Sequence, residues 1–188
     1  AGGTRLFLLN PDGTTAVMLP ANLLFGSLSP DGRRLASGRT SFITPLYRAA
    51  AFPARGEEAI AEKVLDSPHA EYSPRFSPDG SRIAIASTRT GTSQIWLWDN
   101  RFNQGKAVFD RRSYSSGSPA WSPDGRSIAF DARLTGSAAD IWVVSTNGVP
   151  AVQRTNDKAE DMVPCFVPTG MWMYFSSGRA GEPQVFRS

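Results

Sequence analysis

One short motif recurs along the 188-residue chain and limits what the chain can fold into. Its copies are Ser29-Pro30-Asp31-Gly32, Ser77-Pro78-Asp79-Gly80, Ser122-Pro123-Asp124-Gly125 and the altered Val167-Pro168-Thr169-Gly170. The copies are separated by 48, 45 and 45 residues. A nearly fixed period of this length is typical of repeat architectures, so the chain is expected to be a series of similar units.

Each tetrad is followed by the same pattern of apolar residues. An apolar segment begins six residues after the first residue of the tetrad, and an aliphatic residue paired with an aromatic one comes later in the unit. The pairs are Leu46-Tyr47, Ile95-Trp96, Ile141-Trp142 and Val185-Phe186. Short apolar segments between Gly and Pro turns predict antiparallel strands, and a period near 45 fits a four-stranded propeller blade.

The tetrad itself is predicted to be the turn between the first two strands of a unit. Proline presets φ at the second turn position, and glycine accepts a positive φ. The first strands are expected to end at Phe76, Trp121 and Phe166. Prolines at positions 74, 119 and 164 are expected near the start of these strands, where a missing backbone donor is tolerated.

The units divide the chain into three complete blades and two partial ones. The complete blades are predicted at 25–65, 72–110 and 117–154, and the partial ones at 1–19 and 162–188. The predicted fold class is therefore an all-β propeller of four-stranded antiparallel blades, either a single domain or a portion of one. Because open sheet edges pair with other strands, further blades or self-association are expected to complete the ring; the alternative is a closed four-bladed ring whose last blade combines Gln184–Arg187 with Ala16–Leu19. An insertion at Ala50–Glu58 is expected to protrude.

Composition excludes several other classes of protein. The 17 Gly and 14 Pro leave no stretch long enough for a bundle of long helices or for a membrane span. The net charge of +3 arises from 20 basic and 17 acidic residues that are scattered along the chain. Nucleic-acid binding needs a clustered basic footprint, so no nucleic-acid partner is expected.

The repeat resembles a known family. The pattern proline, any residue, aromatic, Ser-Pro-Asp-Gly, then an apolar strand and an Ile-Trp pair, is clearest at Pro74–Trp98 and Pro119–Val143. It resembles the bacterial TolB-like propeller repeat, a relative of the WD-type blade. The resemblance implies a non-catalytic module that binds a protein or peptide in a periplasmic or secreted bacterial protein. The alternatives are an accessory propeller of a larger peptidase or hydrolase, or of a multidomain sensor or regulator.

Catalysis within the chain is the third hypothesis and the weakest. A Ser-His-Asp triad needs a histidine base, but His69 is the single histidine and no Gly-x-Ser-x-Gly elbow is present. The single cysteine, Cys165, excludes an internal disulfide and is expected to be a buried, inert thiol. No cofactor and no metal are expected. Calcium at Asp157 with Glu160-Asp161, or at Asp66 with Glu71, is an alternative that lacks the spacing of a calcium loop.

Charged and aromatic residues at repeated positions have structural explanations. The turn residues Asp31, Asp79 and Asp124 are expected to accept hydrogen bonds from nearby backbone amides. An arginine also recurs near a later turn, at Arg39, Arg89, Arg133 and Arg179. These arginines are expected to pair with a neighbouring blade, with the lining of one face of the ring as the alternative. Trp98 departs from the repeat and is a candidate for an exposed contact.

The loops that join successive blades are the expected binding surface. They share one face of the propeller with the loops between the second and third strands, because strand direction alternates within a blade. Loops on a rigid scaffold commonly carry function, and mixed charge with tyrosine suits a protein contact. The candidate residues are His69, Glu71, Tyr72, Arg111, Arg112, Tyr114, Asp157, Lys158, Glu160 and Asp161.

Overall fold

The computed structural model describes residues 7–9, 15–18, 23–31, 34–39, 46–50, 60–99, 101 and 104–188. Within these residues three sheets have four antiparallel strands, one has three and one has two. The four-stranded sheets are β3–β6, β7–β10 and β11–β14; the others are β15–β17 and β1–β2. The predicted fold class, with three complete units and two partial ones, is confirmed.

The strand bounds follow the repeat. The first two sheets contain β1 (Phe7–Leu9), β2 (Thr15–Met18), β3 (Leu23–Leu28), β4 (Arg34–Arg39), β5 (Leu46–Ala50) and β6 (Glu62–Leu65). The next contains β7 (Glu71–Phe76), β8 (Arg82–Ser87), β9 (Gln94–Asp99) and β10 (Gly105–Phe109). The last two contain β11 (Tyr114–Trp121), β12 (Ser127–Leu134), β13 (Ala139–Ser145), β14 (Val152–Gln153), β15 (Asp161–Phe166), β16 (Met173–Ser177) and β17 (Gln184–Arg187).

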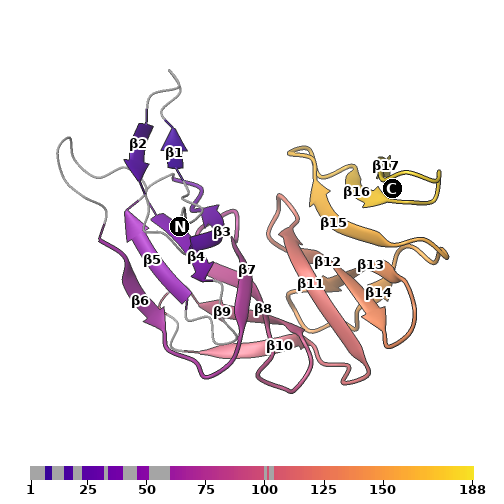
Figure 1. The fold of residues 1–188 in the computed structure, drawn as a ribbon, viewed down its shortest axis with the longest axis horizontal. Helices are drawn as coiled ribbons and strands as arrows, with labels where there is room; N and C mark the ends of the chain where they lie inside the picture. Colours follow the sequence, from indigo (N-terminus) through magenta and orange to yellow (C-terminus); the bar gives the residue numbers. More distant parts are fainter. Residues whose placement is uncertain are drawn as a thin grey trace, which may run out of the picture.

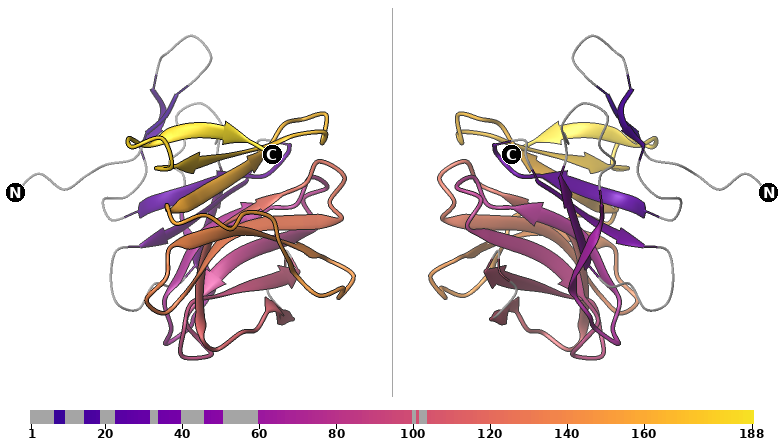
Figure 2. Two further views of the ribbon diagram at one scale, coloured as in Figure 1. Left: turned by 90° about the vertical axis from the view of Figure 1, so that its right-hand side faces the viewer. Right: turned by 90° about the vertical axis from the view of Figure 1, so that its left-hand side faces the viewer.

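The sheets follow one another around an open arc (Figure 1). The first strands of consecutive sheets are neighbours: β3 contacts β7, β7 contacts β11, and β11 contacts β15. In the side views of Figure 2, turns and loops project from both ends of the strands. Among the described strands, β17 is hydrogen-bonded to β16 alone and β2 to β1 alone, so no described strand closes the arc.

The Ser-Pro-Asp-Gly tetrads form the turns between the first and second strands, as predicted. In the second copy the Gly80 amide donates to the Ser77 carbonyl at 2.8 Å, and Gly80 has a φ of 68°. The Asp79 carboxylate accepts from the Ser77 hydroxyl at 2.6 Å and from the Ser81 amide at 3.0 Å. Asp124 repeats this arrangement, and Asp31 accepts from the Ser29 hydroxyl. These hydrogen bonds lower the pKa of Asp79 to about 2.

The first strand of each of the last three sheets carries a β-bulge. The residues before the prolines have positive φ: Ser73 at 52°, Ser118 at 46° and Val163 at 54°. The strand register shifts at the same places. The prolines at 74, 119 and 164 therefore lie within the strands, which corrects the expectation that they stand near the start. A bulge tolerates them because it already interrupts the hydrogen-bond ladder.

The junction between the sheets β7–β10 and β11–β14 is sealed by a guanidinium and an indole. The Arg82 guanidinium lies 5.0 Å from the Trp121 ring centre and donates to the Gly125 carbonyl at 3.1 Å. The Trp121 indole donates to the Arg75 carbonyl at 2.9 Å. Apolar side chains from β8, β9, β12 and β13 form one core cluster across this junction. Cation–π contact and apolar burial together hold the two sheets face to face.

The predicted protruding insertion at Ala50–Glu58 lies outside the described residues, apart from Ala50 at the end of β5. No helix long and apolar enough to cross a membrane occurs in the ranges that the structure describes.

Substituting Asp79 by Ala is expected to lower the free energy of unfolding by about 0.5–2 kcal/mol, because the turn loses three hydrogen-bond acceptor contacts. Since the folded pKa lies below the ordinary value of 3.8, the carboxylate stabilises the fold above about pH 4. This stabilisation is lost as the pH falls toward 2. Urea unfolding of the wild type and the variant at pH 7 and pH 2.5 measures it; an equal difference at both pH values would contradict the assignment.

Candidate functional site

The loops that precede β7, β11 and β15 lie on the face opposite the tetrad turns. The loop before β11 is positioned by Gln94, which is completely buried at the start of β9. Its side-chain amide donates to the carbonyls of Tyr114 at 2.8 Å and Arg111 at 3.2 Å, and its side-chain oxygen accepts from the Arg111 amide. Strand β9 of the preceding sheet thus fixes the backbone of the loop, while the side chains of the loop remain exposed.

The arginines of this loop differ in their surroundings. The Arg111 guanidinium lies 4.9 Å from the Trp142 ring centre and also faces Phe109 and Tyr114. Arg112 is exposed at the tip of the loop. Tyr114 is half-buried and meets the Trp142 ring edge-on at 5.6 Å. Arg111 therefore presents positive charge above aromatic rings, whereas the Arg112 side chain extends from the loop into solvent.

The loop before β15 is ordered by two carboxylates. Asp140 accepts from Gln153 at 2.9 Å and from the Asp157 amide at 3.2 Å. Glu160 accepts from the Ala139 amide at 2.9 Å and pairs with the Arg133 guanidinium at the same distance. These contacts tie the loop to the start of β13 and leave the Asp157 and Lys158 side chains exposed.

An open depression of about 460 Å³ lies beside the start of β11, bordered by the loop between β12 and β13 and by the loop before β15. Its lining includes Tyr114, Leu134 and Asp140 together with Asp157 and Lys158. The depression therefore brings together three of the predicted candidates, Tyr114, Asp157 and Lys158. Neutral, acidic and basic groups in one concave surface suit a polar peptide segment better than a purely apolar ligand.

Two predicted candidates do not belong to the exposed surface. Glu71 and Asp161 are the first residues of β7 and β15, and both are completely buried. Glu71 pairs with Arg89, and Asp161 accepts from Arg179 at 2.5 Å. Burial raises the pKa of the Glu71 carboxyl, against the opposing effect of Arg89. The expectation that these acids lie on exposed loops is wrong, because each sits beside the turn arginine of its own sheet.

The same contacts correct the expectation for the recurring arginines. Arg89 and Arg179 pair within their own sheets, not with a neighbouring one. Arg133 pairs with Glu160 in the segment before the next sheet. In this unit Leu134 stands at the position that corresponds to Arg89 and Arg179, and Arg133 is one residue before that position. Arg39 ends β4, and its side chain lies outside the described residues.

Other candidates are placed as follows. His69 and Tyr72 are half-buried; the His69 amide donates to the Ser67 hydroxyl, and the Tyr72 hydroxyl contacts the Ser93 hydroxyl. Trp98 is 8% exposed and lies beside Trp96, which excludes it as an exposed contact. In the part of the chain that is described, no three His, Cys, Asp or Glu residues are arranged to hold a metal ion.

The predicted burial of Cys165 is wrong, because the residue is exposed. Alternation in β15 explains the difference. Phe166 packs on the apolar cluster that β15 and β16 share with β12 and β13, so its neighbour Cys165 faces the other side of the sheet.

Sequence reasoning missed Gln94, which positions a loop, and Trp172, which is 42% exposed immediately before β16. A signal for Trp172 is present in the repeat. Ser81-Arg82 and Arg126-Ser127 occupy the same places in the two preceding tetrad turns, where Met171-Trp172 stands in the last one.

Comparison with known proteins gives the family. The model of the TolB β-propeller domain matches residues 47–188. The peptidase YuxL of Bacillus subtilis, itself uncharacterised, is 31% identical over 154 residues, which are 79% of this chain and 21% of that protein. A TolB homologue of Chlorobium luteolum is 30% identical over 119 residues, 60% of this chain and 25% of that protein.

The fold agrees with solved structures as well. A TolB structure from Agrobacterium tumefaciens superposes with a TM-score of 0.79 at 24% identity, covering 92% of this chain and 60% of that one. The chain spans about a quarter or less of the length of the curated relatives it matches. The tetrad turns, the antiparallel sheets and the family match over most of the chain agree, and the chain belongs to the TolB β-propeller family.

Proposed function

We propose that this chain is a non-catalytic propeller module that binds a protein or peptide through the loops before β11 and β15. The observation that carries the proposal is the depression of about 460 Å³ bordered by ordered loops with exposed side chains of both charges. Gln94 and Asp140 fix the loop backbones, so binding would require little ordering of the protein. The resemblance to TolB supports a periplasmic or secreted location for this binding.

A second function is favoured by the match to a peptidase of Bacillus subtilis. In that case the chain is an accessory propeller of a hydrolase whose catalytic residues lie in another domain. The two functions share a binding module without catalytic residues of its own. Hydrolysis of peptide substrates by the full-length parent protein, and not by these 188 residues, would favour the accessory role.

The open arc supports a proposal about assembly. The edge of β17 that faces away from β16 is not paired with any described strand. Open strand edges pair readily with other strands. We therefore propose that a fourth strand, supplied by further blades or by a second copy of the chain, pairs with this edge in the working protein.

Replacing Arg112 or Lys158 by Ala is expected to weaken partner binding about tenfold or more while changing stability by less than about 0.5 kcal/mol. Both side chains are exposed, and neither has a hydrogen bond or ion pair to a described residue. Tyr72 and Tyr114 are unsuitable for this test, because both pack against the core cluster. A partner recovered by pull-down and identified is titrated against each variant, with thermal melting as the check on folding.

The matched control is Asp79→Ala, which alters a turn on the opposite face. It is expected to lower the melting temperature and leave affinity unchanged. Lost binding in a folded Asp79→Ala variant, together with unchanged binding in the two loop variants, would place the working surface on the tetrad face.

A further inference from the structure

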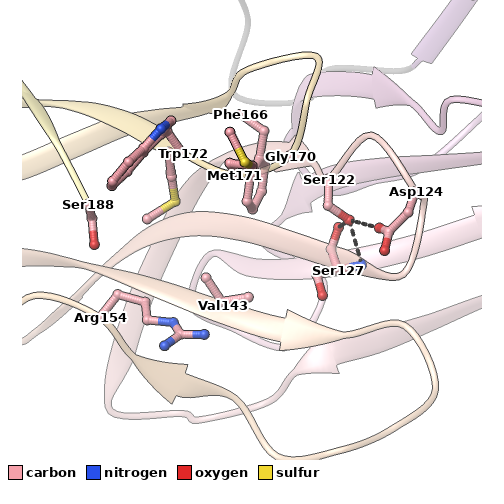
Figure 3. Close-up of a pocket in the computed structure, with 11 residues that line it drawn as sticks. Ser122, Asp124, Ser127, Val143, Arg154, Phe166, Gly170, Met171, Trp172 and Ser188 are labelled. Carbon is pink, nitrogen blue, oxygen red and sulfur yellow. Dashed lines mark hydrogen bonds between the residues drawn. The ribbon is translucent and has the colours of Figure 1, made fainter.

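A second cavity lies at the junction between the sheets β11–β14 and β15–β17. Its volume is about 350 Å³. Figure 3 shows Phe166, Met171 and Trp172 on the β15–β17 side and Val143 and Arg154 on the β11–β14 side. The tetrad residues Ser122 and Asp124 stand at one end. This groove opens beside the tetrad turns and is therefore separate from the loop face proposed above.

The repeat explains why this space is empty. At the preceding junction, Arg82 fills the equivalent position by stacking on Trp121 and donating to the Gly125 carbonyl. In the next unit Ser127 takes the place of Arg82, and Phe166 takes the place of Trp121. The backbone junction is otherwise kept: Pro78 lies beside Gly125, and Pro123 lies beside Gly170. Ser127 is shorter than arginine and Phe166 is smaller than tryptophan, so a cavity remains at this junction although the backbone arrangement is the same.

The groove has an exposed apolar wall that the other turns lack. Met171 is 74% exposed and Trp172 is 42% exposed. One face of the Trp172 ring is covered by the Arg187 guanidinium at 4.0 Å, which holds the indole in place. Exposed tryptophan and methionine beside a cavity are frequent anchors for a bound chain, because a ligand side chain can bury large apolar area there.

The charges in the groove define the ligand. The Arg154 guanidinium lines the cavity and has no hydrogen bond or ion pair with any described residue. Asp124, at the other end, already accepts from the Ser122 hydroxyl at 2.6 Å and from the Arg126 amide at 3.0 Å. The charged group that remains available to a ligand is therefore the Arg154 guanidinium, a cation. Guanidinium groups bind carboxylates through paired, charge-assisted hydrogen bonds.

We propose that the groove binds an extended peptide segment in which an acidic residue is next to a large apolar one. The acidic side chain meets Arg154, and the apolar side chain lies between Trp172 and Val143. Two junctions can be compared in full, and only the one between β11–β14 and β15–β17 lacks an arginine equivalent to Arg82. The site therefore belongs to one pair of sheets and not to every repeat.

The test uses the 188-residue chain and a blocked ten-residue peptide with the central sequence Glu-Leu-Glu-Phe, labelled for fluorescence anisotropy. Two matched peptides carry Gln or Lys in place of both Glu residues. The acidic peptide is expected to bind at least about tenfold more tightly than either, since a charge-assisted contact is lost in both. Equal binding of the three peptides, or tighter binding of the Lys peptide, would overturn the proposal.

Two protein variants test the site from opposite directions. Arg154→Gln removes the cation from an exposed position, and Ser127→Arg refills the cavity with the residue found at the preceding junction. Each is expected to weaken the acidic peptide at least about tenfold, whereas Lys106→Gln, a loss of charge on β10, is not. In Ser127→Arg the new guanidinium can stack on Phe166 and donate to the Gly170 carbonyl, so the melting temperature is expected to be kept.

The same titrations separate this site from the loop face. Binding that is lost in Arg112→Ala but kept in Ser127→Arg and Arg154→Gln would place the peptide on the loops and overturn the groove. Binding that is lost in Ser127→Arg and kept in Arg112→Ala supports the groove. Failure of the groove leaves the proposed loop function standing, because that function is tested with its own variants and partner.

Discussion

The variant Arg89→Ala is expected to lose about 3–5 kcal/mol of unfolding free energy, the usual effect of leaving one member of a buried ion pair behind. Its partner, the Glu71 carboxylate, is completely buried. Arg89 also lies 4.8 Å from the ring centres of Trp96 and Trp98. Removing the guanidinium therefore leaves a buried charge without its cation and uncovers two indole rings. Urea unfolding followed by tryptophan fluorescence measures the loss.

The matched control is the double variant Glu71→Gln with Arg89→Ala, which removes the buried charge as well. It is expected to recover part of the loss. In the single variant the pKa of Glu71, already raised by burial, is expected to rise further. A raised pKa means that stability is greater at low pH and is lost as the pH rises through the folded pKa. A double variant no more stable than Arg89→Ala would show that the lost packing, and not the charge, causes the effect.

The sheets could be predicted from the sequence because the turns repeat. Each of the first three tetrads combines a proline that presets φ, a carboxylate that accepts backbone amides and a glycine that accepts a positive φ, and the fourth keeps the proline and the glycine. Asp79 and Asp124 act in this way. The apolar segments at a fixed distance from each turn then define the strands. Local chemistry and the period point to the same fold, which is why these boundaries agree with the structure.

The buried acids could not be predicted in the same way. Glu71 and Asp161 stand where a loop becomes a strand, and the sequence alone does not show on which side of that boundary a residue lies. Their burial depends on an arginine 18 residues later in the chain, which the turn brings back beside them. In the unit between them, Ser116 stands at the position of the acid and Leu134 at the position of the arginine. The Ser116 amide donates a hydrogen bond to the carbonyl of Ser93, which precedes β9.

The bulges account for the other differences. Positive φ at Ser73, Ser118 and Val163 is rare for residues other than glycine, and β-branched Val163 is the least expected of them. The bulge inserts a residue before each proline and changes which side chains face the core. The exposed thiol of Cys165 follows from the face that β15 turns outward after its bulge. Such a feature is imposed by packing between sheets, and not by local preference.

Phe130→Ala is expected to lower the free energy of unfolding by about 3–5 kcal/mol, the usual loss for a buried phenylalanine. Phe130 is completely buried in the cluster that joins β8 and β9 to β12 and β13, with its ring 4.8 Å from that of Phe109. The substitution opens a cavity between two sheets and leaves each sheet's own hydrogen bonds in place. Urea unfolding and amide hydrogen exchange measure the loss and its location.

The matched variant is Ile141→Ala, which is equally buried but belongs to the cluster shared with β15 and β16. In a repeat protein each unit is stabilised mainly by its neighbours, so a weakened junction acts first on the sheets beside it. Phe130→Ala is expected to raise exchange most in β8 and β9, and Ile141→Ala in β16 and β17. If both variants raised exchange equally in all sheets, the chain would unfold as one cooperative unit. A cavity at one junction, including the natural one beside Ser127, would then weaken the whole arc and not only its own pair of sheets.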